Sequence, residues 1–128
     1  MRTKVLKVLG MIIVALVVLV AGGIYWADAT EDRCWQSEAT QAFAHYETLK
    51  SRSAILRDAA ATGRDIARSD PRSIELVEKE PNGCSLGSNG RTVVRFYFDS
   101  SEKLLTMQVF RDYLAADYTM EMIDERKF

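Results

Sequence analysis

The sequence predicts an α+β protein with an N-terminal transmembrane helix, then one long amphipathic helix packed on a three- or four-stranded antiparallel meander. Three observations predict this fold: an uncharged apolar run at 8–27, apolar residues at helical spacing over 37–67, and short β-branched and aromatic runs after Pro71. A chain of 128 residues has room for a single domain beyond the apolar run. We therefore expect a basic cytoplasmic segment at 1–7, a signal-anchor or uncleaved signal at 8–27, and an exported domain at 28–128.

The run at 8–27 contains 20 residues and no charge. A helix of this length spans ~30 Å, which matches the hydrocarbon core of a bilayer. The residues that precede it include three basic side chains, Arg2, Lys4 and Lys7. The positive-inside rule therefore predicts a single pass through the inner (cytoplasmic) membrane, with the N-terminus in the cytoplasm and the C-terminal domain in the periplasm or otherwise outside. Tyr25 and Trp26 are placed where interfacial aromatic residues are expected.

The same N-terminal segment has a second possible fate. Ala27-Asp28-Ala29 fits the small-x-small pattern of a signal-peptidase site, so cleavage after Ala29 is the alternative to a retained anchor. The apolar core is longer than the roughly 7 to 15 residues of secretory signals, and the bulky Tyr25 and Trp26 precede the site. We therefore favour the anchor.

The chain has two cysteines, Cys34 and Cys84, and they do not form a Cys-x-x-Cys motif. An exported domain meets oxidising conditions, so a disulfide between them is the natural inference. A bridge closing a loop of about 50 residues stabilises the folded state by roughly 4 kcal/mol in the loop-entropy account.

Apolar residues recur every three or four positions over 37–67, which predicts one long helix. This helix should end at or before Ser69, because Pro71 disfavours the helical conformation of the residue before it, Asp70. Charged residues supply the opposite, solvated face. We selected three of them as a candidate partner surface, because charge reversal there alters electrostatic complementarity without unfolding the domain: Glu47, Arg57 and Arg64.

Short strands are predicted after Pro71. Residues 73–79 form either a strand or a short helix capped by Asp70-Pro71, and 81–90 form a glycine-rich loop. Residues 91–98 give the clearest strand, with apolar Val94, Phe96 and Phe98 on the face predicted to pack against the helix. A hairpin turn at 99–102 leads to a strand at 103–113, and a last strand is predicted at 118–124.

The sequence offers no catalytic, cofactor or metal site. Gly83-Cys84-Ser85-Leu86-Gly87 matches the G-x-S-x-G nucleophile pattern, but no helix signal and no histidine follow it. His45 is the only histidine, and it has no strong metal ligand at helical spacing. The glutamates at 75, 78 and 80 alternate, which indicates one solvated strand face. We therefore expect a protein that is not an enzyme.

The charge balance bears on partners. Residues 28–128 carry 14 basic and 18 acidic side chains, a formal net charge of −4, which argues against a nucleic-acid surface. We expect residues 8–27 to contact the lipid bilayer and the exported domain to bind an envelope protein as a non-catalytic interaction module. An alternative is a periplasmic inhibitor or immunity protein against an exported enzyme.

A further alternative comes from layout. An N-terminal apolar helix that continues into an amphipathic helix, an antiparallel sheet and one disulfide resembles the plan of type IV pilin-like subunits. Those proteins carry a short basic leader cut before phenylalanine or methionine and a glutamate near the start of the apolar run. This chain has Gly10-Met11, but no glutamate before Glu31. The resemblance implies a pilin-like subunit as a further alternative function.

Overall fold

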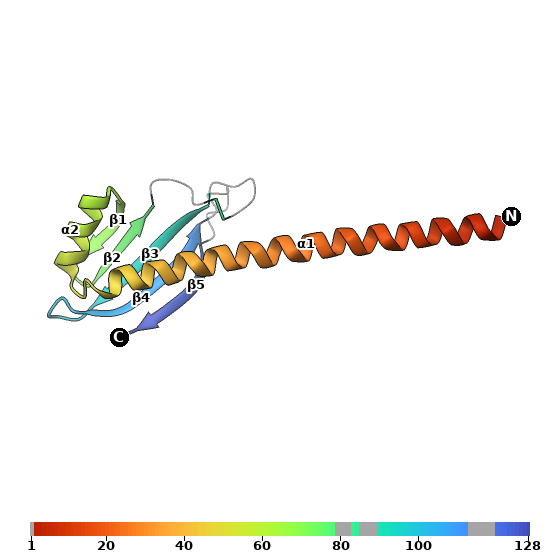
Figure 1. Ribbon diagram of the computed structural model, residues 1–128. Helices are drawn as coiled ribbons and strands as arrows, with labels where there is room; N and C mark the ends of the chain where they lie inside the picture. Colours follow the sequence, from red (N-terminus) through yellow and green to blue (C-terminus); the bar gives the residue numbers. More distant parts are fainter. Residues whose placement is uncertain (1, 79–82, 85–89, 113–119) are drawn as a thin grey trace. The chain divides into compact units, whose positions relative to one another are not determined.

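The computed structural model describes residues 2–78, 83–84, 90–112 and 120–128. The chain divides into two compact units, Met1–Arg33 and Cys34–Phe128. Helix α1 (Arg2–Glu47) forms the described part of the first unit, and its last residues begin the second (Figure 1). Each unit is described by itself below.

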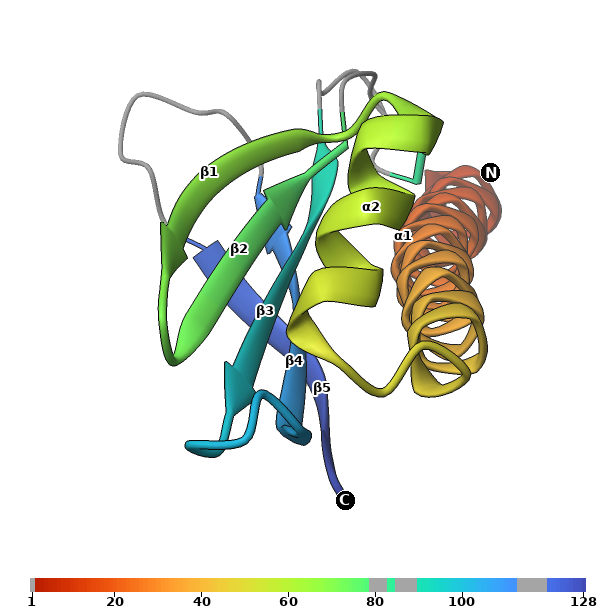
Figure 2. The ribbon, with the colours of Figure 1, turned by 90° about the vertical axis from the view of Figure 1, so that its left-hand side faces the viewer.

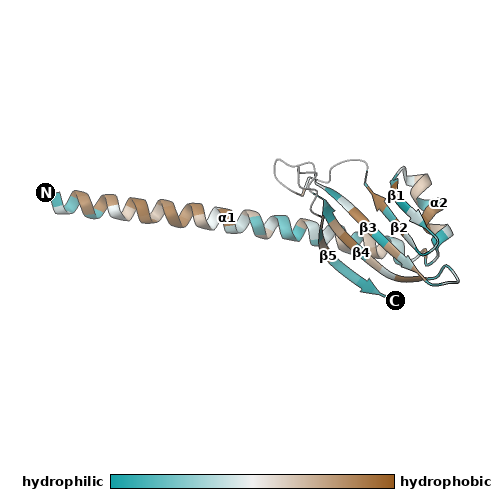
Figure 3. Cartoon of the chain, turned by 180° about the vertical axis from the view of Figure 1, so that it is seen from behind, coloured by the Kyte–Doolittle hydropathy of each residue, from teal (hydrophilic) through white to brown (hydrophobic). Residues whose placement is uncertain are grey.

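The first unit is an apolar helical segment. Its most hydrophobic window has a mean hydropathy of 2.8, and none of that window is buried. Figure 3 shows the apolar residues as an almost continuous band along this part of α1. The helix is long and apolar enough to cross a membrane, a property that signal sequences share. Tyr25 and Trp26, the predicted interface residues, are 78% and 71% exposed.

The second unit contains a five-stranded sheet whose strands are all antiparallel and follow each other in sequence order. The strands are β1 (Asp65–Asp70), β2 (Ser73–Val77), β3 (Arg91–Phe98), β4 (Leu104–Asp112) and β5 (Met120–Lys127). Helix α2 (Arg52–Thr62) and the end of α1 lie on one face of this sheet (Figure 2). The predicted α+β class is therefore confirmed.

The core lies between the two helices and the sheet. Its aromatic centre consists of Phe43 and Tyr46 from α1 and Phe96 and Phe98 from β3. The rest of the core is aliphatic, apart from one methionine: Ala39, Ile55, Ala59, Ile74, Leu76, Val94, Leu104, Met107 and Val109. Each large apolar side chain buried in this way contributes ~1.5 to 3 kcal/mol. The predicted burial of Val94, Phe96 and Phe98 is confirmed, because all three belong to this core. Val93 on the opposite face is buried as well, so the alternation of buried and exposed residues in β3 is incomplete.

The prediction of one helix over 37–67 is wrong. α1 ends at Glu47, and Lys50 adopts a left-handed backbone conformation with φ of 58°. Ser51 then caps α2 by accepting a hydrogen bond from the Ala54 amide at 3.3 Å. Gly63, with φ of 69°, ends α2 in the left-handed conformation that glycine tolerates best. The end of α1 and the short helix α2 can bury the same apolar stripe as one continuous helix over 37–67. The periodicity of the sequence therefore did not reveal the break.

Strand β1 occupies residues that the sequence assigned to the end of that helix and to the stretch just after it, so the sheet has five strands instead of three or four. Every residue of β1 is exposed except Asp70, which leaves no alternating pattern to detect. The hairpin to β2 is held by Asp70, whose carboxylate accepts hydrogen bonds from the Arg72 and Ser73 amides at 3.0 and 2.8 Å. Arg52 of α2 donates to the Asp70 carbonyl at 3.1 Å, which ties the helix to this hairpin.

The remaining strands agree with the sequence. Residues 73–79 contain the strand β2, not the alternative helix, and β3 has the predicted bounds. The turn at 99–102 is present, with the Asp99 carboxylate accepting from the amides of Ser101 and Lys103 at 2.8 and 3.0 Å. The last strand extends to Lys127 rather than ending at 124, and the predicted start at 118 lies outside the described residues.

Candidate functional site

The three charges selected as a partner surface have different surroundings. Glu47 accepts a hydrogen bond from Arg126 of β5 at 3.0 Å. Arg64 lies over the Tyr46 ring, with its Cζ 5.1 Å from the ring centroid. Arg57 is exposed on α2. Each of these side chains therefore has its own set of contacts.

The predicted disulfide is present. Cys34 and Cys84 are joined with an S–S distance of 1.99 Å and a Cα–Cα distance of 5.4 Å. The bridge connects the part of α1 that begins the second unit to the segment preceding β3. It therefore links two segments 50 residues apart in sequence.

Of the two residues considered for catalysis, only His45 lies within the described residues. His45 is exposed, and its Nε2 lies 2.8 Å from Oδ2 of Asp58, which links α1 to α2. Ser85 lies outside the described residues. Within the described ranges, no group of three or more His, Cys, Asp or Glu side chains is arranged to hold a metal ion.

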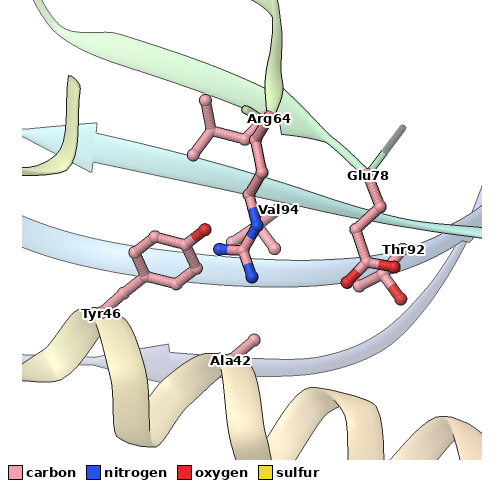
Figure 4. Close-up of a pocket in the computed structure, with 7 residues that line it drawn as sticks. Ala42, Tyr46, Arg64, Glu78, Thr92 and Val94 are labelled. Atoms are coloured by element: carbon pink, nitrogen blue, oxygen red, sulfur yellow. The ribbon is translucent and has the colours of Figure 1, made fainter. Parts of the chain in front are cut away.

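A small polar pocket lies between α1, Arg64 just after the C-cap of α2, and strands β2 and β3 (Figure 4). Its cavity volume is about 10 Å³, close to the space that one water molecule requires. The pocket is lined by both core and polar side chains: Ala42, Tyr46, Arg64, Leu76, Glu78, Thr92 and Val94.

Tyr46 forms one wall of this pocket. It is 1% exposed, and its ring packs edge-on against Phe96 with centroids 4.8 Å apart. Its Oη is buried and has no hydrogen-bond partner. Figure 4 shows this hydroxyl directed toward the Arg64 guanidinium. The helix end fixes the backbone of Arg64, whose amide donates to the Ala59 carbonyl at 3.0 Å.

Glu78 forms the opposite wall. Partial burial raises the pKa of its carboxyl above the usual value, and the nearby charge of Glu38 raises this pKa further. Arg64 and a hydrogen bond with Thr92 act in the other direction but do not cancel the effect. The pocket thus combines a cation, a hydroxyl and a carboxyl that is protonated more readily than usual.

Sequence reasoning missed this pocket. It placed Glu75, Glu78 and Glu80 on one solvated strand face, whereas Glu75 binds Arg95 at 2.8 Å and Glu78 is half-buried. Glu80 lies outside the described residues. The signal for Tyr46 was its position on the apolar stripe of a helix, which indicates burial but not the environment of its hydroxyl.

A second candidate site is the surface along β5. Within the described part of the second unit, five of the six exposed large apolar side chains lie on β3, β4 or β5, or directly after β5. Four of them lie along β5 and define what we call the β5 edge surface: Met120 and Met122 at one end of the strand, and Leu105 and Phe128 at the other. Phe128 is held beside β4, because its amide donates to the Leu105 carbonyl at 2.9 Å. β5 is also the last strand of the sheet, and no described strand lies beyond it.

Comparisons with protein-family models, with curated proteins and with solved structures find no significant match to this chain. Its fold and sites therefore define a class only: a small disulfide-bonded α+β domain that follows an apolar N-terminal helix.

Proposed function

We propose that this chain is a small membrane-anchored module of the cell envelope whose exported domain binds another protein without catalysing a reaction. The apolar part of α1 serves as the anchor, and the domain lies in the periplasm or otherwise outside the cytoplasm. The exposed apolar side chains at 8–27 and the Cys34–Cys84 disulfide support this location, because the first favour lipid and the second favours an oxidising compartment.

The β5 edge surface is the observation that carries the binding proposal. An edge strand presents unpaired backbone amides and carbonyls, which an extended segment of a partner can pair with as an added strand. β5 has eight residues and contains neither proline nor glycine. Met122 on this strand is 51% exposed, and methionine is enriched at protein interfaces. Backbone pairing would supply affinity, and the exposed apolar side chains would supply contacts for the partner.

Charges on β5 make the edge selective. Glu121 is paired with Arg111 of the neighbouring strand at 2.7 Å, and Lys127 lies 3.7 Å from Glu125. Natural proteins use such charges to prevent indiscriminate pairing of edge strands. A partner segment therefore needs complementary charges as well as β-strand conformation.

Site-specific photo-crosslinking in cells that naturally make the protein tests this proposal. A photoreactive residue replaces Met122 in one variant and Ile66 in the control, because Ile66 is an exposed apolar residue on the opposite edge strand β1. We expect an adduct with an envelope protein at 122 and none at 66. Equal adducts at both positions, or no adduct at 122, would contradict the proposal. An adduct with an exported enzyme would favour the inhibitor alternative.

The orientation has its own test. A reporter that is active only outside the cytoplasm, fused after Phe128, is expected to be active because the basic side chains precede the apolar segment. The matched control is a reporter active only inside the cytoplasm, fused at the same position. Activity of the second reporter and silence of the first would reverse the proposed topology.

A pilin-like subunit is the second candidate function. One observation favours it: α1 is a single helix from Arg2 to Glu47, and its final turns, with Phe43 and Tyr46, pack against an antiparallel sheet. Intact mass separates the possibilities. A retained anchor begins at the N-terminal methionine, a cleaved signal gives a chain beginning at Thr30, and pilin-type processing gives one beginning at Met11. The last result would replace the anchor proposal.

A further inference from the structure

We infer that the pocket between α1, β2 and β3 binds a single ordered water molecule that bridges Tyr46 Oη, the Arg64 guanidinium and the Glu78 carboxyl. This site is independent of the β5 edge surface. Three observations carry the inference: an unpartnered buried hydroxyl, a cavity of the right size, and two opposite charges held apart across it.

The hydroxyl of Tyr46 points to a ligand. A buried polar group without a hydrogen bond is unfavourable, so native structures satisfy such groups with protein atoms or with ordered water. No described protein atom makes a hydrogen bond with Tyr46 Oη. The ring itself is fixed by its contact with Phe96, so the hydroxyl cannot turn away from the pocket without disturbing the core.

The size of the cavity selects the ligand. A volume of about 10 Å³ is at the lower limit of the space that one water molecule requires. A cavity of this size stays dry when its walls are apolar, but water enters when two to four polar groups line it. Here a hydroxyl, a guanidinium and a carboxyl meet that requirement.

Arg64 and Glu78 both line the pocket without forming a direct ion pair. In the described structure, no ion pair within 4.0 Å joins Arg64 to Glu78, although Figure 4 shows the guanidinium between the Tyr46 hydroxyl and the Glu78 carboxyl. Arg64 is near enough to influence the ionisation of Glu78. A polar contact that is too long for a direct hydrogen bond is the geometry that a bridging water completes.

The same charges exclude ions. Arg64 disfavours a cation in the pocket. The carboxyl groups of Glu78 and Glu38 disfavour an anion, since the charge of Glu38 already raises the free energy of negative charge at this place. A neutral molecule that both donates and accepts hydrogen bonds remains, and water is the one that fits.

A conservative substitution of Tyr46 changes the stability of the domain in opposite directions, depending on whether the pocket holds a water molecule. Tyr46→Phe keeps the ring and removes only the hydroxyl. If the hydroxyl binds water, the substitution removes a satisfied hydrogen bond and lowers the folding equilibrium constant by about 2- to 10-fold. If the hydroxyl has no partner, removing it raises that constant. Tyr97→Phe is the comparison, because Tyr97 is 36% exposed on β3 and interacts with Arg95, so this variant removes a tyrosine hydroxyl at the surface of the domain.

The experiment combines structure and stability. A high-resolution crystal structure of the full-length, disulfide-intact protein is expected to show a density peak within hydrogen-bond distance of Tyr46 Oη and Arg64, and chemical unfolding is expected to rank Tyr46→Phe below Tyr97→Phe. An empty pocket in the density overturns the inference. An anomalous bromide peak in the pocket after a bromide soak overturns it too, as does a Tyr46→Phe variant as stable as the wild-type protein or more stable.

Discussion

The guanidinium of Arg126 lies over the ring of Phe43, with its Cζ 4.6 Å from the ring centroid. The same guanidinium donates to Glu47 at 3.0 Å, so one residue of β5 contacts α1 at two positions one turn apart. Arg64 makes a comparable contact with Tyr46. Two arginines distant in sequence thus cover two of the three buried aromatic rings of α1, those of Phe43 and Tyr46.

Removing the first of these arginines should destabilise the domain. Arg126→Ala is expected to lower the free energy of unfolding by about 1 kcal/mol, because a cation–π contact and a surface ion pair each contribute ~0.5 to 1 kcal/mol. Denaturant unfolding measures this change. Lys127→Ala is the control, since Lys127 is highly exposed and its nearest carboxylate is 3.7 Å away. Equal losses in the two variants would show that the stacking on Phe43 contributes nothing.

Removing the disulfide should have a larger effect. Cys34→Ser and Cys84→Ser are each expected to lower the free energy of unfolding by about 4 kcal/mol, the value for releasing a loop of about 50 residues. The double variant should cost no more than either single variant, because both remove the same bond. Unfolding of the oxidised and reduced wild-type protein provides the reference. An additive double variant would mean that the sulfur atoms act through packing rather than through the bond.

The Glu78 carboxyl should make stability fall as pH rises. Its pKa is raised in the folded state, so its contribution is present below the unfolded-state pKa and is lost as pH rises through the folded-state pKa. Glu78→Gln is therefore expected to have little effect at acidic pH and to stabilise the domain at neutral pH. Unfolding measured across this pH range gives the difference between the two proteins.

Asp99 supplies a control of opposite sign. Hydrogen bonds from Ser101 and Lys103 lower the pKa of the Asp99 carboxyl, so its stabilising contribution is present above the unfolded-state pKa and is lost as pH falls through the folded-state pKa. Asp99→Asn should therefore reduce stability at neutral pH and less so in acid. If Glu78→Gln followed the same trend as Asp99→Asn, burial of Glu78 would not be the dominant effect.

Substitutions at the two caps of α2 should destabilise the domain. Ser51→Ala is expected to cost about 1 kcal/mol, because it removes the acceptor for the Ala54 amide. Gly63→Ala is expected to cost a similar amount, ~1 kcal/mol, because φ of 69° is strained for alanine. Ser53→Ala, an exposed change within α2, is the control and should change stability by less than ~0.5 kcal/mol. Cap variants as stable as the control would contradict the assigned ends of α2.

The patterns that are local in the chain were predictable from the sequence. The alternation of Val94, Phe96 and Phe98 placed them on one face of a strand, because side chains in a strand point to opposite sides in turn. The apolar run at 8–27 was also recognisable, because the absence of charge over 20 consecutive residues can be read directly from the sequence. Because the chain has only two cysteines, Cys84 was the only possible disulfide partner of Cys34 within the chain.

The tertiary structure decided what depends on residues far apart in the chain. Asp65–Asp70 forms a strand through its pairing with β2, although its own exposed side chains carry no strand pattern. The polar pocket exists only because the fold brings Tyr46, Arg64 and Glu78 together from α1, the end of α2 and the end of β2. Burial raises the pKa of Glu78, and burial is a property of the packed domain that no local pattern in the sequence contains.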